Sequence, residues 1–302
     1  MPKHVVVSFG EALVDIVNQA NSFQPFVGGA PANVAVAVSK LGGASHFIGS
    51  VGSDLFGDMV VNTLSDHAVD ISALRQLSEH STALAFVSID EEGERSFSFS
   101  RQDTADLRYP LNELPIDLFQ QKKGIFHFGS NSLTTDYMAA ITLALIAVAK
   151  NNDWLVSFDV NLRPSLWPKS VIDESRIMTF LTMADVIKMS DDEMQELDIH
   201  SSLFDVHSQS VFVVTSGANP IQLFTQGGMI EHCPEKVTAI DTTGAGDAFF
   251  GAFLYAMVEE QLFHGDADQY LKAIKFAASC GAFSVQHMGA INSYATSEQM
   301  TF

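Results

Sequence analysis

The sequence is poor in cysteine and in basic residues, and it lacks a long apolar run. Its two cysteines, Cys233 and Cys280, are too few for a disulfide framework and too far apart for a zinc knuckle, so we expect buried free thiols. The 16 Lys and Arg residues are outnumbered by 36 Asp and Glu, which gives a formal net charge of −20. This charge argues against nucleic-acid binding and against anionic membrane surfaces. No uncharged stretch of about 18 apolar residues predicts a membrane span.

Several common motifs are absent as well. The sequence has no Gly-x-x-x-x-Gly-Lys-Ser/Thr loop, no Gly-x-Gly-x-x-Gly after the first strand-like run and no His-x-x-x-His pair. The first residues lead into the strand-like run 4–10 without the apolar region of a signal peptide. We therefore expect a cytoplasmic protein. Any phosphate chemistry must depend on backbone N–H groups, a divalent cation and one or two placed cations rather than on a basic patch.

Short apolar strand-like runs alternate with apolar helical runs along most of the chain. The runs typical of strands are 4–10, 44–51, 124–129, 154–159, 185–189 and 211–215, with a hairpin over 221–229. The runs typical of helices are 34–41, 54–64, 135–150, 174–184 and 191–197. Such alternation predicts an α/β fold with a mostly parallel central sheet and helices on both faces.

Residues 82–100 follow a different pattern: a mostly apolar run, 82–89, is followed by a glycine-containing turn and by the run 95–100, in which polar and apolar side chains alternate strictly. This pattern predicts a β-hairpin. Its place inside an α/β chain indicates a small separate sheet that acts as a lid or as a dimer face. We predict one α/β domain over residues 1–302, with lid segments at about 11–27 and 81–106. Phe97 and Phe99 share one face, which packs on the sugar site, on the core or on the lid of a second subunit. A homodimer through the lid is our preferred interpretation.

The segment 241–247 is the most informative part of the sequence. It lies between a strand-like run, 236–240, and the apolar helical run 248–257. Gly244, Ala245 and Gly246 at a helix start leave backbone N–H groups that can bind an anion with the help of the helix dipole. Asp247 follows directly, and a carboxylate there is expected to take a proton from a hydroxyl during group transfer. The alternative is an ordinary N-terminal cap after a tight turn.

Further polar residues recur where predicted strands end or helices begin, the edge at which open α/β sheets bind ligands. They are Asp15, Asn33, Asn131, Asp159, Asn161, Arg163, Lys188, Glu193, Thr215 and Asp247. Asp159, Asn161 and Arg163 occupy alternate positions, which puts them on one side of an extended segment as a polyol or phosphate contact. A turn with a surface ion pair is the alternative. The Thr215–Gly217 turn either faces a nucleotide phosphate or is a plain turn.

These residues amount to a resemblance. The runs 28–33 and 241–247 are similar to the two signatures of the ribokinase-like (PfkB) carbohydrate kinases. The likeness extends from Gly10 to Ala290, nearly the whole chain. Within that family, the run 159–167 and the pair Ala105-Asp106 most resemble the fructokinases.

The resemblance implies an ATP:sugar phosphotransferase with a ribokinase-like fold. Its implied sugar contacts are Asp15, Gly28, Gly29, Asn33 and Asn161, with Arg101 and Arg163 as substrate or phosphate contacts. Asp247 would be the base, and Gly244, Ala245 and Gly246 the anion hole. The implied nucleotide side comprises Lys188, Glu193, Thr215 and Gly217. Asp241, Thr243, Gly289 and Ser293 would hold a monovalent cation such as K⁺, and Glu193 would order Mg²⁺ through water. The family usually carries Asn-x-x-Glu where this chain has Ser190 to Glu193.

The implied reaction is transfer of the γ-phosphoryl group of ATP to a primary hydroxyl, with fructose as the first choice of acceptor. The alternatives within the class are 2-keto-3-deoxygluconate kinase and aminoimidazole riboside or nucleoside kinase. A non-catalytic sugar or nucleotide sensor is the alternative from another class.

Overall fold

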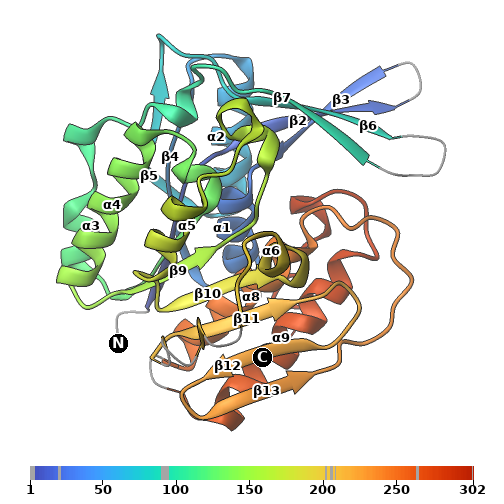
Figure 1. Cartoon of the computed structure of the whole chain (residues 1–302). Coiled ribbons are helices and arrows are strands. Elements are labelled where there is room, and N and C mark those ends of the chain that lie inside the picture. The colour runs from blue at the N-terminus through green and yellow to red at the C-terminus, as the bar shows by residue number, and fades with distance from the viewer. Residues whose placement is uncertain are drawn as a thin grey trace.

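One large sheet passes through the body of the molecule (Figure 1). The computed structural model describes residues 4–19, 22–89, 95–200, 203–204, 207, 209–262, 265–300 and 302. Within these residues, nine strands form the large sheet in the order β13-β12-β11-β10-β9-β8-β1-β4-β5. The strands are β1 (Val5–Phe9), β4 (Ala44–Gly52), β5 (Asp70–Leu77), β8 (Gly124–Gly129), β9 (Leu155–Asp159), β10 (Val186–Ser190), β11 (Val211–Thr215), β12 (Ile221–Thr225) and β13 (Gly228–His232). All neighbours pair in parallel except β11–β12 and β12–β13, which are antiparallel.

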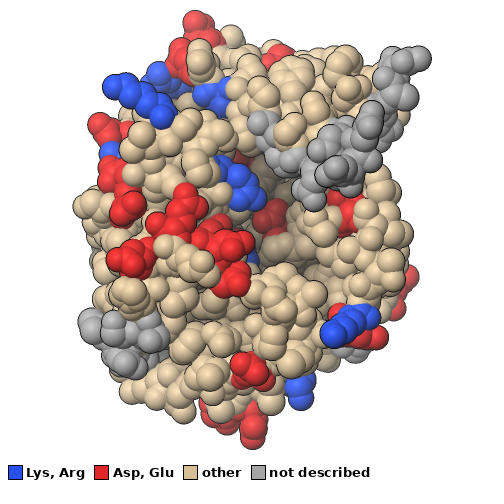
Figure 2. All heavy atoms as spheres, turned by 45° about the vertical axis from the view of Figure 1, so that its right-hand side comes forward, with Lys and Arg blue, Asp and Glu red and all other residues tan. Residues whose placement is uncertain are grey.

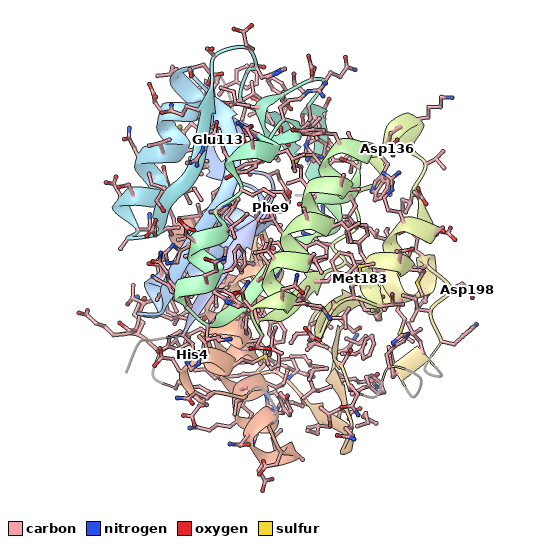
Figure 3. The ribbon with its side chains drawn as sticks, turned by 90° about the vertical axis from the view of Figure 1, so that its left-hand side faces the viewer. His4, Phe9, Glu113, Asp136, Met183 and Asp198 are labelled. Carbon is pink, nitrogen blue, oxygen red and sulfur yellow. The ribbon has the colours of Figure 1, made fainter. Side chains whose placement is uncertain are left out.

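Helices cover both faces of this sheet. The helices are α1 (Ala30–Lys40), α2 (Leu55–Asp66), α3 (Ile116–Gln121), α4 (Asp136–Asn151), α5 (Glu174–Leu181), α6 (Asp191–Glu196), α8 (Ala245–Glu259) and α9 (Ala267–Ser284). One apolar cluster joins α3, α4 and α5 to the sheet, and another joins α1, α8 and α9 to it. Figure 3 shows Phe9 in the interior, whereas Glu113, Asp136 and Asp198 lie toward the outside. The predicted fold class is therefore confirmed.

A second, smaller sheet projects beyond the α/β body (Figure 1). Among the described residues it has four strands in the order β3-β2-β6-β7. They are β2 (Leu13–Gln19), β3 (Ser22–Gly28), β6 (Leu84–Ile89) and β7 (Arg95–Ser100). The predicted hairpin over 82–100 corresponds to β6 and β7, while the side chain of Phe97 and the turn 90–94 lie outside the described part. The predicted lid segments, 11–27 and 81–106, contain these strands except for Gly28.

The hairpin β6–β7, which we call the second lid hairpin, is attached to the body at both of its ends. Before β6, the carboxylate of Asp54 accepts hydrogen bonds from the backbone N–H and the hydroxyl of Thr82, each 2.8 Å long. After β7, Arg101 donates to Asp106 at 2.5 Å and to the Asn131 carbonyl at 3.1 Å. The Arg101 and Asp106 side chains are 5% and 0% exposed, so this ion pair is buried.

Several local expectations were wrong. The run 236–240 is not a strand: it is irregular, and Ile240 is 64% exposed. The antiparallel hairpin β12–β13 already occupies that edge of the large sheet. Helix α1 begins at Ala30, before the predicted position 34, because Pro31 is tolerated in a first helical turn. Cys233 is exposed, and only Cys280 is buried as expected. In the part of the chain described here, none of the helices has the length and apolar character to cross a membrane.

Candidate active site

A cavity of about 730 Å³ opens beside the carboxyl ends of β9, β10 and β11. The predicted residues that line it are Asn161, Arg163, Lys188, Glu193, Thr215, Gly217, Gly244, Ala245, Gly246 and Asp247. Figure 2 shows a deep hollow on one face of the molecule, with acidic and basic side chains around its edge. Residues far apart in the sequence meet here because parallel strands all end at the same edge of the sheet.

Helix α8 starts at this cavity with glycine as its N-cap. Gly244 has φ 72° and ψ 6°, a left-handed conformation that glycine adopts without steric cost. It has no side chain to accept hydrogen bonds from the first turn. The Ala245 N–H donates to the Thr242 carbonyl at 3.2 Å, so the remaining first-turn N–H groups are the ones that can bind a ligand. The positive end of the helix dipole adds to the attraction for an anion.

Asp247 lies in the first turn of α8 and is 9% exposed. Its Oδ2 accepts a 2.8 Å hydrogen bond from Nδ2 of Asn33. Burial raises the pKa of Asp247 to about 7, since the hydrogen bond from Asn33 offsets only part of the desolvation. The N-cap position itself belongs to Gly244, so Asp247 is not the cap residue. A carboxyl group that titrates near neutral pH can take a proton and release it again.

Below the anion site, Lys188 and Asp159 form a buried ion pair. Nζ of Lys188 lies 2.9 Å and 3.0 Å from the two carboxylate oxygens of Asp159. Burial alone would lower the pKa of Lys188, but the negative charges of Asp159 and Glu193 outweigh it, so the pKa is raised. A Cβ atom added to Gly246 would lie 3.5 Å from this Nζ. The ammonium group therefore lies just behind the start of α8.

Glu193 joins two segments of the cavity wall. One carboxylate oxygen accepts from the backbone N–H of Leu162 at 2.7 Å, and the other from that of Ser190 at 2.8 Å. The hydroxyl of Ser190 in turn accepts from the N–H of Glu193, which completes a capping box at the start of α6. Ser190 thus takes the helix-capping role that an Asn can also fill.

The three alternate polar residues that start with Asp159, the last residue of β9, do not share one side. Asn161 and Arg163 line the cavity, but Asp159 turns to Lys188. Asn161 has φ 34°, and this positive angle ends the extended geometry on which the prediction depended.

Arg101 does not line the cavity among the described residues. Its bonds to Asp106 and Asn131 hold the end of the lid instead.

The predicted sugar side lies where the lid meets α1. Gly28 and Gly29 have no room for a side chain, since an added Cβ would clash at 2.6 Å with Oδ2 of Asp15 and at 2.5 Å with the Glu11 carbonyl, respectively. Gly29 also has φ 104°. Asp15 on β2 is therefore held close to the backbone that precedes α1, and Asn33 in the first turn of α1 reaches Asp247.

Three of the four predicted cation ligands, Asp241, Thr243 and Gly289, come together, and the fourth, Ser293, bonds to Ser284 at the end of α9. The carboxylate of Asp241 accepts from the backbone N–H groups of Thr243 at 2.9 Å and Gly289 at 2.8 Å. The Ser293 hydroxyl lies 2.7 Å from that of Ser284. Asp241 and Ser293 are buried.

The apolar wall of the cavity was not predicted. It is made by side chains of β12, α8 and α9 and by the residue after α9, namely Ile221, Phe249, Ala278, Ala282 and Val285. Gly281 lets α9 approach Phe249, since an added Cβ would lie 3.3 Å from the Phe249 Cβ. The small residues Ala278, Gly281 and Ala282, at helical spacing, were the available signal. A slot with one apolar wall suits a flat heterocycle.

An ionisable carboxyl group beside a helix N-terminus without a side-chain cap, at the ligand edge of a parallel sheet, is the arrangement of a group-transfer enzyme that acts on an anion. Comparison with known proteins narrows this class. The profile of the pfkB family carbohydrate kinases matches residues 3–297, so the chain belongs to that family. The resemblance inferred from the two glycine-rich runs is confirmed, and with it the expectation of an ATP:sugar phosphotransferase.

The chain is 38% identical over 306 residues to probable fructokinase-2 of Arabidopsis thaliana, covering 96% of this chain and 92% of that protein. It is 36% identical to fructokinase-1 of Zea mays, covering 99% and 97%. The structure of Xylella fastidiosa fructokinase with bound ATP superposes with a TM-score of 0.92 at 35% identity, covering 98% and 97%. Aminoimidazole riboside kinase of Salmonella enterica, with aminoimidazole riboside and an ATP analogue, gives 0.84 at 28% identity, covering 98% of each chain.

A fructokinase of Vibrio cholerae O395 is also similar in structure. In its form with fructose, ADP and calcium ion, the TM-score is 0.88 at 34% identity, covering 97% of this chain and 96% of that one.

Proposed function

We propose that this protein transfers the γ-phosphoryl group of ATP to a primary hydroxyl of fructose. The observation that carries the proposal is the place of Asp247, a buried carboxyl with a pKa of about 7 in the first turn of a helix whose N-cap is glycine. The fructokinases among the relatives and the fructose-bound Vibrio cholerae structure support the choice of sugar.

The cavity supplies the nucleotide side of the reaction. Its volume of about 730 Å³ suits a nucleoside triphosphate, with the base against the apolar wall and Thr215 and Gly217 nearby. The N–H groups of Gly244 and Gly246 and the ammonium of Lys188 then face the phosphates, and the Ala245 N–H joins them if it exchanges its bond to the Thr242 carbonyl for one to the ligand. They stabilise the charge that spreads over the phosphoryl oxygens during transfer. Arg163, which lines the same cavity, is the further cation on this side.

The sugar enters between the lid and α1, where Asp15, Gly28, Gly29 and Asn33 bind its hydroxyls. Asp247 takes the proton of the primary hydroxyl as that oxygen forms a bond to the γ-phosphorus. The bond from the γ-phosphorus to the bridging oxygen breaks, and ADP leaves. The lid sheet closes over the sugar and excludes water, which would otherwise compete as acceptor. We also propose that the chain is a single domain over residues 1–302. In a homodimer, the lids of the two subunits would form the contact.

The residues present fit a magnesium ion carried by the nucleotide. Among the described residues, no cluster of three or more His, Cys, Asp or Glu side chains could hold a metal ion by itself. Mg²⁺ usually keeps several waters and binds through one or two carboxylates plus substrate phosphates. Glu193 lines the cavity and would hold such waters. The ion would neutralise charge on the phosphates. We further propose that the Asp241 loop, with Thr243, Gly289 and Ser293, holds a monovalent cation such as K⁺.

The test is ADP release with a panel of fructose, ribose, 2-keto-3-deoxygluconate and aminoimidazole riboside. We expect the highest kcat/KM with fructose. A higher kcat/KM with another member of the panel would show that fructose is not the preferred acceptor. The variant Asp247→Asn should lower kcat at least about 100-fold with the Kd for the sugar little changed. A variant that turned over at the wild-type rate would contradict the role of Asp247. If a sugar binds but no member of the panel causes ADP release, the result would favour a non-catalytic sugar or nucleotide sensor.

A further inference from the structure

We propose that the hydroxyl group of Tyr294 binds an oxygen of the sugar and so helps to select the acceptor. This inference rests on the proposed function of the site. Neither of the two glycine-rich runs contains Tyr294, and it was not among the residues predicted from the sequence.

Tyr294 is a buried polar group that lacks a partner. The residue is 2% exposed, and its Oη atom has no hydrogen-bond partner in the described part of the chain. A buried hydroxyl without a partner destabilises a fold, and such groups in native structures are typically satisfied by a ligand or water. The ring belongs to an apolar cluster with residues of β2, α1 and α8, and this cluster holds the hydroxyl in place.

The hydroxyl lies at the start of α8. A Cβ atom added to Gly244 would meet Oη of Tyr294 as its nearest neighbour. Gly244 is the N-cap of α8 and lines the cavity. Tyr294 does not itself line that cavity, but its hydroxyl lies against the start of α8, and it comes from a segment that follows the predicted cation loop.

Two carboxylates act on this hydroxyl. Burial raises the pKa of Tyr294 well above its usual value, and the negative charges of Asp247 and Asp15 raise it further. The group thus stays protonated and can donate a hydrogen bond. Asp247 belongs to α8 and Asp15 to β2 of the lid, so Tyr294 lies near the carboxylates of both the phosphoryl-transfer side and the sugar side.

The chemistry of these groups favours a sugar oxygen as the partner. Ionised carboxylates only accept hydrogen bonds, whereas a polyol offers oxygens that also need donors. The Tyr294 hydroxyl supplies such a donor beside two acceptors. A phosphoryl oxygen is the less suitable partner, because the donors at the start of α8 and Lys188 already face the phosphates and Asp15 would repel further negative charge.

The test uses Tyr294→Phe, which removes only the oxygen atom. We expect fructose to bind roughly 3- to 10-fold more weakly by calorimetry, as for loss of one hydrogen bond. The KM for ATP should stay unchanged, and the melting temperature should not fall. The matched control is Tyr270→Phe, a buried tyrosine whose hydroxyl bonds to the Leu262 carbonyl, and it should leave sugar binding unchanged. An unchanged Kd for fructose in Tyr294→Phe would overturn the proposal, and so would a raised KM for ATP alone.

Deoxy analogues of fructose identify the partner oxygen. For the analogue that lacks it, wild type and Tyr294→Phe should bind equally well, while the other analogues keep the difference. An equal loss with every analogue would indicate a loosened site and would contradict a direct contact. The experiment measures sugar binding rather than turnover, so the role of Tyr294 can be tested separately from the proposed kinase activity. A protein that binds fructose without releasing ADP refutes the proposed function but still tests Tyr294. If another panel sugar binds instead, the same comparison is made with that sugar, and a protein that binds no sugar refutes both.

Discussion

Asn33 and Asp247 are 214 residues apart in the sequence and share a buried hydrogen bond of 2.8 Å. The bond joins the first turn of α1 to the first turn of α8, the two helices that carry the glycine-rich runs. Asn33 donates, and its own Oδ1 has no partner in the described residues. The amide thus orients the carboxyl of Asp247 and keeps an acceptor for a ligand.

Loss of the Asn33 donor should shift the pH dependence of the reaction. The hydrogen bond from Asn33 lowers the pKa of Asp247, so in Asn33→Leu that pKa should rise. The acidic limb of the kcat profile at saturating sugar should move to higher pH by about 1 unit, as expected for one hydrogen bond to a charged group. Ser45→Ala removes a side-chain bond to the Ala35 carbonyl of α1 and serves as the control. An unmoved limb in Asn33→Leu would contradict the contact.

The raised pKa of Asp247 also predicts how stability depends on pH. Between its usual value of 3.8 and about 7, the native state binds a proton that the unfolded state has released. This site therefore makes the fold less stable as the pH rises through that range, by on the order of 4 kcal/mol in total. Asp247→Asn should be more stable than wild type at about pH 8, and the difference should shrink toward about pH 4. A gap in melting temperature that is the same at both pH values would show that Asp247 is not the cause.

The Lys188–Asp159 pair offers a test that separates stability from catalysis. Lys188→Met leaves the carboxylate of Asp159 buried without its partner, which should cost about 3–5 kcal/mol of unfolding free energy. The double variant with Asp159→Leu should recover much of that loss, because neither charge is then buried alone. Its kcat should stay low, since the cation behind Gly246 is still missing. Recovery of kcat together with stability would mean that Lys188 serves only the fold.

Two glycines that line the same cavity form a matched pair. Gly244 and Gly217 both have positive φ angles, 72° and 53°, so alanine is strained at either position. An added Cβ at Gly217 meets nothing within 4 Å, whereas at Gly244 it would lie 2.7 Å from the Cβ of Ala290. Gly217→Ala should lose about 1–2 kcal/mol of stability with kcat within about 3-fold of wild type. Gly244→Ala should lose more stability and at least about 10-fold in kcat. Equal effects of the two changes would argue against the helix start as the anion site.

The sequence was most informative where chemistry restricts the backbone. The Gly244–Asp247 turn and the Gly28–Gly29 pair could be placed because few residue types permit that geometry. Strand–helix alternation was sufficient for the sheet. The alternation did not predict β5, which pairs with β4 at the edge of the large sheet. It also did not predict α9, although Asp266 and Gln269 form a capping box at the start of that helix.

Other features depended on contacts between distant segments, which spacing does not encode. The partner of Asp159 became evident only when β9 and β10 were paired, and the anchoring role of Arg101 only when the lid met η3 (Ser130–Leu133). The run 236–240 has the composition of a strand, but the sheet edge beside it was already taken by β12 and β13. The sequence pattern therefore missed both buried ion pairs, Arg101–Asp106 at the lid and Lys188–Asp159 below the anion site.

The two attachments of the second lid hairpin determine how the small sheet can respond to a ligand. Thr82 bonds to Asp54 at one end, and Arg101 bonds to the Asn131 carbonyl at the other. A segment clamped at both roots deforms by bending and twisting along its strands rather than by swinging about a single hinge. Movement over a bound sugar should therefore be small near residues 82 and 101 and should grow with distance from them.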